Sequence, residues 1–122
     1  MLLKRASIAC TLLALLPNAA LAGAADVEKV TLQKGSDGLY TFNVTVRHAD
    51  EGWDHYANRW DVVAPDGTVL GTRTLLHPHV DEQPFTRSLR GVMVPAGVKS
   101  VVIRAHDSVH KLGGAQVTVE LE

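Results

Sequence analysis

From Val27 to Leu121 the sequence alternates apolar and polar residues with a period of two, and glycine, proline and aspartate interrupt the pattern. In the clearest stretch every second position carries a large apolar residue: Tyr40, Phe42, Val44 and Val46. This period is typical of strands with one buried and one solvated face, whereas an amphipathic helix repeats every three to four residues. The sequence therefore predicts an all-β, antiparallel domain.

The interruptions divide the alternating region into seven predicted strands, which span about residues 27–34, 39–47, 59–64, 69–76, 85–94, 98–106 and 115–121. The fourth has a weak pattern and is expected at a sheet edge, and a shift of parity near Gly91 predicts a bulge in the fifth. Three tight turns and three longer connections join them. This arrangement predicts a seven-stranded antiparallel sandwich of immunoglobulin-like shape, with a small closed barrel as the alternative.

The first 22 residues have the three parts of an export signal. Lys4 and Arg5 are followed by a short apolar run, Pro17 interrupts it, and Ala20-Leu21-Ala22 is a small-x-small cleavage site. The apolar run is too short for a permanent membrane span. We therefore expect a signal peptide, residues 1–22, and one β-sandwich domain, residues 23–122; a buried N-terminal helix is the alternative.

The mature chain is expected to contain no thiol, because Cys10 is the single cysteine and lies inside the signal. The residues before Cys10 match a lipid-attachment pattern poorly. Removal of Lys4 and Arg5 leaves ten basic residues against thirteen acids and no basic run, which argues against nucleic acid as a partner. The prediction is a periplasmic or secreted protein with no transmembrane anchor in the mature chain.

The most unusual stretch is 48–60, which holds two histidines, three acids, a tyrosine and two tryptophans. It is too polar for a core, and we interpret it as a site-bearing loop between two strands. In a sandwich, alternate connections lie at opposite ends, so 48–58, 77–84 and 107–114 share one end. All six histidines fall in or beside these connections: His48, His55, His77, His79, His106 and His110.

Clustered imidazoles with nearby carboxylates suit transition metals such as iron, copper, zinc or nickel better than hard cations. The predicted metal ligands are His48, His55, His77, His79, Asp107 and His110. Three acids are candidates to orient the imidazole rings: Asp54, Asp81 and Glu82.

Several assignments within this set stay open. In extended backbone His77 and His79 point to opposite sides, so one of the two is expected in a shared site. His106 and Asp107 alternate in the same way, and one of them is expected to face the centre. Trp60 begins an alternating strand and is assigned to the core. Trp53 and Tyr56 are expected to pack over the site, with ligand stacking or capping of the sandwich as alternatives.

Two segments together resemble the iron-binding domain of the desulfoferrodoxin and superoxide reductase family. They are the loop from His48 to Trp60, with its His55-Tyr56 pair before a strand, and the segment 105–110, Ala-His-Asp-Ser-Val-His. The resemblance implies a seven-stranded immunoglobulin-like sandwich and a mononuclear iron held by four histidines and one cysteine. It matches His48 and His55 to the loop ligands and His110 to the late histidine.

The resemblance breaks at the cysteine, whose place Asp107 occupies. A carboxylate is a harder and less electron-releasing donor than the thiolate that tunes the family's iron. The family's remaining early histidine has no counterpart before His48, so His77 or His79 would have to replace it. The resemblance covers about residues 47–113.

Three functions therefore remain open from the sequence. The first is a small exported metal-binding protein that works with a periplasmic partner protein. The second is an enzyme, a mononuclear iron redox protein acting on a reactive oxygen species. The third is an interaction module without a metal, in which the same loops hold a protein or a sugar and the histidines act as pH-sensitive hydrogen-bond partners.

Overall fold

The computed structural model describes residues 23–121. The predicted export signal and Cys10 lie outside the described residues. Seven strands form, and their bounds are β1 (Asp26–Lys34), β2 (Tyr40–Arg47), β3 (Ala57–Val63), β4 (Val69–Thr74), β5 (Phe85–Val92), β6 (Ser100–Asp107) and β7 (Val117–Glu120). Over residues 23–121 there is no helix with the length and apolar character needed to cross a membrane.

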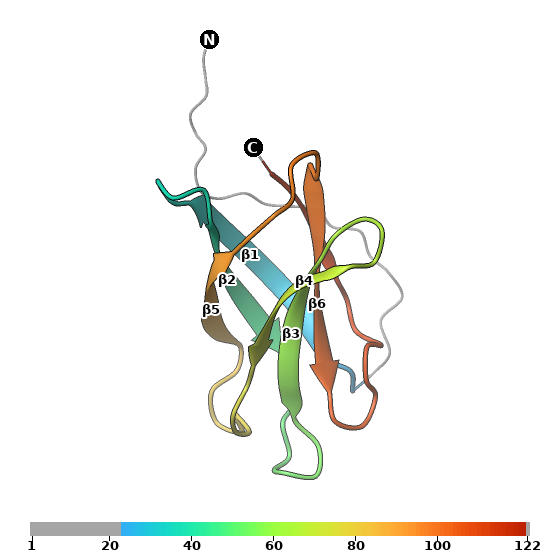
Figure 1. Ribbon diagram of the computed structural model, residues 1–122. Helices are drawn as coiled ribbons and strands as arrows, with labels where there is room; N and C mark the ends of the chain where they lie inside the picture. Colours follow the sequence, from blue (N-terminus) through green and yellow to red (C-terminus); the bar gives the residue numbers. More distant parts are fainter. Residues whose placement is uncertain (1–22, 122) are drawn as a thin grey trace.

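The strands form two antiparallel sheets that face each other (Figure 1). One sheet has the order β1-β2-β5 and the other β4-β3-β6-β7. This arrangement confirms the predicted all-β sandwich, and the closed-barrel alternative is wrong because the two sheets are separate. β4 lies at a sheet edge, as its weak pattern indicated.

Every second side chain of β2, from Tyr40 to Val46, is buried between the sheets. The opposite layer of the core comes from β3 and β6, where Trp60, Val62 and Ile103 are fully buried. Trp60 is thus a core residue, as predicted. The alternation along each strand decides which side chains enter the core, since successive residues point to opposite faces.

The predicted bulge in β5 is present. Between Leu89 and Val92 this strand has one residue more than its partner β2 has between Phe42 and Tyr40. Gly91 has a φ of 71°, a conformation that glycine adopts without steric cost. The bulge re-aligns the end of β5, which stops at Val92 instead of continuing to Val94 as predicted.

The short turns and the long connections lie at opposite ends of the sandwich (Figure 1). The segments that follow β2, β4 and β6 are together at one end, and β1 begins there. We call this the histidine end, because it carries the six histidines. β3 begins at Ala57, inside the predicted loop, because Ala57 pairs with Asp107 of β6.

A buried carboxylate connects three strands of the larger sheet. Asp61 of β3 accepts hydrogen bonds from Thr72 Oγ1 at 2.9 Å and from Arg104 Nε at 2.9 Å, and both residues are its cross-strand neighbours. Arg59 Nε lies 3.2 Å away. Burial alone would raise the pKa of Asp61, but these hydrogen bonds outweigh it and hold the pKa below its ordinary value of 3.8.

Replacing Asp61 by asparagine should lower the free energy of unfolding by about 1–3 kcal/mol at neutral pH, because two arginines lose their charged partner. Because the pKa of Asp61 is lower in the folded than in the unfolded protein, its ionised carboxylate stabilises the fold fully above the unfolded-state pKa. This stabilisation is lost as the pH falls through the folded-state pKa. Urea unfolding from pH 7 to pH 2 should therefore show a smaller loss of stability in Asp61→Asn than in the parent. Glu120→Gln, on the exposed side of β7, is the control; equal acid profiles for Asp61→Asn and the parent would contradict this account.

Candidate metal site

Asp107, the last residue of β6, is the centre of the histidine end and is fully buried. Its Oδ2 atom lies 2.8 Å from His55 Nε2 and 3.1 Å from His110 Nδ1. His48 Nε2 is 3.4 Å from the same oxygen. Three imidazoles from three separate segments of the chain therefore surround one carboxylate oxygen.

The turn after β6 holds this carboxylate in place. Asp107 and Lys111 exchange two backbone hydrogen bonds of 3.0 Å, and Lys111 has a φ of 61°. The amides of Val109 and His110 donate hydrogen bonds to the Asp107 carboxylate. An aspartate at the start of a turn commonly accepts such bonds from the amides that follow it. Burial would raise the pKa of Asp107, but the hydrogen bonds from His110 and Val109 and the charge of His48 lower it, so the carboxylate is ionised at neutral pH.

His48 follows directly after β2, and its ring is buried. Its Nδ1 atom forms a hydrogen bond with Asp50 Oδ1. Its Nε2 atom lies 2.9 Å from the carbonyl oxygen of Gly23, in addition to the contact with Asp107. A carboxylate on Nδ1 fixes the ring orientation and leaves Nε2 directed at the cluster.

Asp50 connects the loop after β2 to its neighbours. Its Oδ1 atom also accepts from the amide of Ala57 at 3.0 Å, and its Oδ2 atom accepts from the amide of His79 at 2.6 Å. The side chain is fully buried. One carboxylate therefore binds His48, the start of β3 and the connection between β4 and β5.

His55 lies in a tight turn that begins at Glu51. The amide of Glu51 donates to the carbonyl of His55 at 2.8 Å, the amide of His55 donates to the carbonyl of Gly52 at 3.2 Å, and Gly52 has a φ of 123°. Glu51 Oε1 lies 3.2 Å from His55 Nδ1. Burial alone would lower the pKa of His55, but the hydrogen bonds with Glu51 and Asp107 raise it above 6.5.

The structure does not bring His77 and His79 into the group around Asp107. Their two rings lie 4.6 Å apart, and the His79 ring stacks on Phe85 at 4.0 Å. The two rings were expected on opposite sides only in an extended backbone; this part of the connection is bent, so the rings lie beside each other. His79 Nε2 accepts from Arg87 Nη2 at 3.0 Å, since a guanidinium only donates.

This contact gives His79 a neutral ring with its proton on Nδ1. The Nδ1 atom is buried, has no hydrogen-bond partner within residues 23–121, and lies 4.0 Å from Asp50 Oδ2. Burial, Arg87 and His77 lower the pKa of His79. His79 therefore faces the second oxygen of the carboxylate whose first oxygen holds His48.

Of the neighbouring residues His106 and Asp107, Asp107 is the one whose side chain faces the centre of the histidine end. His106 Nδ1 bonds to Asn58 Oδ1 at 2.7 Å, away from the cluster, and burial together with Arg59 and Lys111 lowers the pKa of His106.

Trp53 is two-thirds exposed and meets the Tyr56 ring edge-on at 5.5 Å.

Sequence reasoning named Asp107 but missed Asp50 and Glu51, the other two acids that hold the imidazoles. In the described part of the chain the carboxylates hydrogen-bonded to histidine rings belong to Asp50, Glu51 and Asp107. The acids predicted for this role were Asp54, Asp81 and Glu82, and Glu82 contacts Arg87 instead. Glu51 could have been found from the sequence, because it stands four residues before His55. Asp50 could not, because its role depends on backbone amides from two other segments.

The cluster could hold a metal ion. One ligand atom from each of His48, His55 and Asp107 lies within 4.8 Å of the other two. Metal–ligand distances of about 2.0–2.2 Å put two ligands of one ion at most about 4.4 Å apart. The ligand atoms would therefore have to move only slightly toward one another to bind an ion. His48 and Asp107 are buried while His55 and His110 are partly exposed, which gives an ion a route from solvent.

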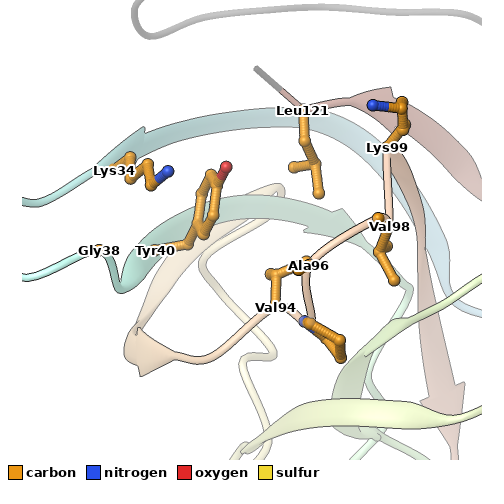
Figure 2. Close-up of a pocket in the computed structure, with 10 residues that line it drawn as sticks. Lys34, Gly38, Tyr40, Val94, Ala96, Val98, Lys99 and Leu121 are labelled. Carbon is orange, nitrogen blue, oxygen red and sulfur yellow. The ribbon is translucent and has the colours of Figure 1, made fainter.

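A cavity of about 220 Å³ lies at the opposite end of the sandwich (Figure 2). It is formed by the end of β1, the start of β2 and the segment between β5 and β6, with Tyr40, Val94 and Leu121 in its wall. Lys34 and Lys99 stand at its sides. None of the predicted metal ligands lines this cavity.

Comparison with known proteins finds a relative that matches most of this chain. The sequence is 44% identical over 98 residues to a protein of Halomicrobium mukohataei named "Putative lipoprotein", and the match covers 80% of this chain and 48% of that protein. The chain thus spans about half the length of this relative. No family model and no solved structure matches the sequence.

Asp50→Ala should lower the free energy of unfolding by about 2–4 kcal/mol, because the buried amides of Ala57 and His79 lose their acceptor. Glu51→Ala, a neighbouring substitution on the exposed side of the loop, should change it by less than about 0.5 kcal/mol. Chemical unfolding of the metal-free proteins measures both. A metal-free Asp50→Ala protein as stable as the parent would show that Asp50 does not connect these segments.

Proposed function

We propose that this chain is an exported protein that binds a transition metal ion at the histidine end. The ligands are His48 Nε2, His55 Nε2 and the Asp107 carboxylate, with His110 Nδ1 as the fourth donor. The observation that carries the proposal is the convergence of three imidazole nitrogens on a single buried carboxylate oxygen. Imidazole and carboxylate together suit iron, copper and zinc.

The surroundings support this assignment. His48 has its Nδ1 atom on Asp50 and His55 has its Nδ1 atom on Glu51, so each ring directs Nε2 toward the centre. Carboxylates in this position fix the ring and increase its basicity, as they do behind metal-bound histidines in general. A cation would also compensate the negative charge of buried Asp107.

Export is supported by two independent observations. Residues 1–22 have the composition of a signal peptide, and the relative from Halomicrobium mukohataei is named "Putative lipoprotein". We place the mature chain in the periplasm or outside the cell, where a partner protein would deliver or receive the ion.

Metal binding is tested by titrating metal-free mature protein with Zn(II), Cu(II) and Fe(II) against competing chelators. We expect a single ion per chain, and a loss of affinity of about 100-fold or more in both His55→Ala and Asp107→Asn. His106→Ala is the matched control, because its ring points away from the cluster, and it should keep the parent affinity. A parent protein that binds none of the three ions would reject the proposal.

His79→Ala separates the two histidine groups. Because His79 faces Asp50 and Arg87 instead of Asp107, this variant should retain the ion with a modest loss of affinity, about tenfold at most. If His79→Ala lost the ion and His55→Ala kept it, the ion would bind at the connection between β4 and β5 and not at the cluster around Asp107.

An iron redox enzyme is the second candidate. His48, His55 and Asp107 without His110 are the two imidazoles and one carboxylate of many non-haem Fe(II) sites with open coordination positions, and the resemblance to the superoxide reductase family points in the same direction. Protein loaded with Fe(II) should then consume superoxide faster than the same protein loaded with Zn(II). Equal rates for the two forms would leave metal binding without this activity.

A further inference from the structure

Gly23 is the first described residue, and its backbone lies in the metal site. Its carbonyl oxygen is 2.9 Å from His48 Nε2, the nitrogen that also faces Asp107. A Cβ atom on Gly23 would stand 2.9 Å from His110 Cε1 and 3.3 Å from His110 Nε2. The backbone of Gly23 therefore approaches two of the imidazoles, and its nearness to His110 together with a φ of 88° favours glycine at this position.

The residues that follow Gly23 are fixed in this position. Ala24 and Ala25 are buried, and Gly114 passes so close to the Ala25 carbonyl that a Cβ on Gly114 would lie 1.7 Å from the oxygen. Asp26 Oδ1 accepts from the amide of Ala115 at 2.8 Å, and the amide of Val27 donates to the carbonyl of Ala115 at 2.9 Å. The start of the domain is thus attached to Gly114 and Ala115, in the segment between β6 and β7 that also carries His110.

The predicted cleavage site gives Gly23 a further group that can bind a metal. The small-x-small pattern Ala20-Leu21-Ala22 predicts cleavage between Ala22 and Gly23. Cleavage converts the amide nitrogen of Gly23 into an α-amine, which can donate a lone pair to a metal after releasing a proton. The amine and the carbonyl oxygen of one residue form a five-membered chelate ring with a metal ion.

We propose that the mature N-terminus is part of the metal site: the α-amine and carbonyl oxygen of Gly23 bind the ion together with the imidazoles around Asp107. This inference rests on the proposed metal-binding function. It explains why a glycine stands at this position, and it makes export a condition for the complete site, because the unprocessed chain has an amide in place of the amine.

The first measurement is the intact mass of protein recovered from the periplasm after expression of the full chain. The mass should correspond to a chain that begins with Gly23. A chain that begins at any other residue would overturn the inference.

The second measurement compares three metal-free proteins in Cu(II) and Zn(II) titrations with competing chelators. They are the chain that begins at Gly23, the same chain with Ala22 retained, and the chain that begins at Gly23 with one alanine added after Glu122. Retained Ala22 moves the amine one residue away, so affinity should fall about tenfold or more, while the alanine at the other end should have no effect. Equal thermal unfolding of the metal-free forms shows that all three fold alike.

The outcomes separate the two proposals. Equal affinity with and without Ala22 would overturn the role of the N-terminus and leave the imidazole site intact, whereas no binding by any of the three would overturn both. As a direct check, the electron paramagnetic resonance spectrum of the Cu(II) form should change when glycine is labelled with ¹⁵N in the chain that begins at Gly23. The same label should leave the spectrum unchanged in the chain that retains Ala22, and an unchanged spectrum in both would contradict coordination by the amine.

Discussion

The buried carboxylate of Asp107 is the constraint on which the histidine end depends. An ionised carboxylate taken out of water is costly unless hydrogen bonds and positive charge compensate it. The turn 107–111 supplies two backbone amides, and His48, His55 and His110 supply ring nitrogens. Together with Asp50, the Asp107 carboxylate therefore organises the loops of this end, an arrangement that would also suit a cation.

The sandwich explains why segments so far apart in sequence meet at this point. β2 ends just before His48, β6 ends at Asp107, and Ala57 at the start of β3 pairs with Asp107. Rigid strands thus bring the site to the end of the sandwich, and Asp50 connects the loops through its two oxygens. If the proposed ion binds here, this support would keep its ligands close to the binding geometry beforehand and so reduce the cost of ordering them.

Much of this end could be predicted from the sequence, because alternation fixes the strands and the order of the connections fixes which loops are neighbours. The sequence predicts a shared end for His48, His55, Asp107 and His110, together with His77 and His79, which the structure places outside the group around Asp107. It could not place His79, whose position depends on stacking with Phe85 and on the Arg87 guanidinium, or choose between His106 and Asp107 without the pairing register. Asp50 could not be predicted because its carboxylate accepts from backbone amides of other segments, and Gly23 could not because it meets His48 through its own backbone carbonyl; neither contact leaves a periodic signal.

The most direct test is a crystal structure of the mature protein grown with Zn(II), with anomalous data collected on both sides of the zinc absorption edge. The account predicts one anomalous peak at about 2.0–2.2 Å from His48 Nε2, His55 Nε2 and an Asp107 oxygen. A peak between His77 and His79, or ions found at surface carboxylates and not in the cluster, would contradict the claim that Asp107 and its imidazoles form the metal site.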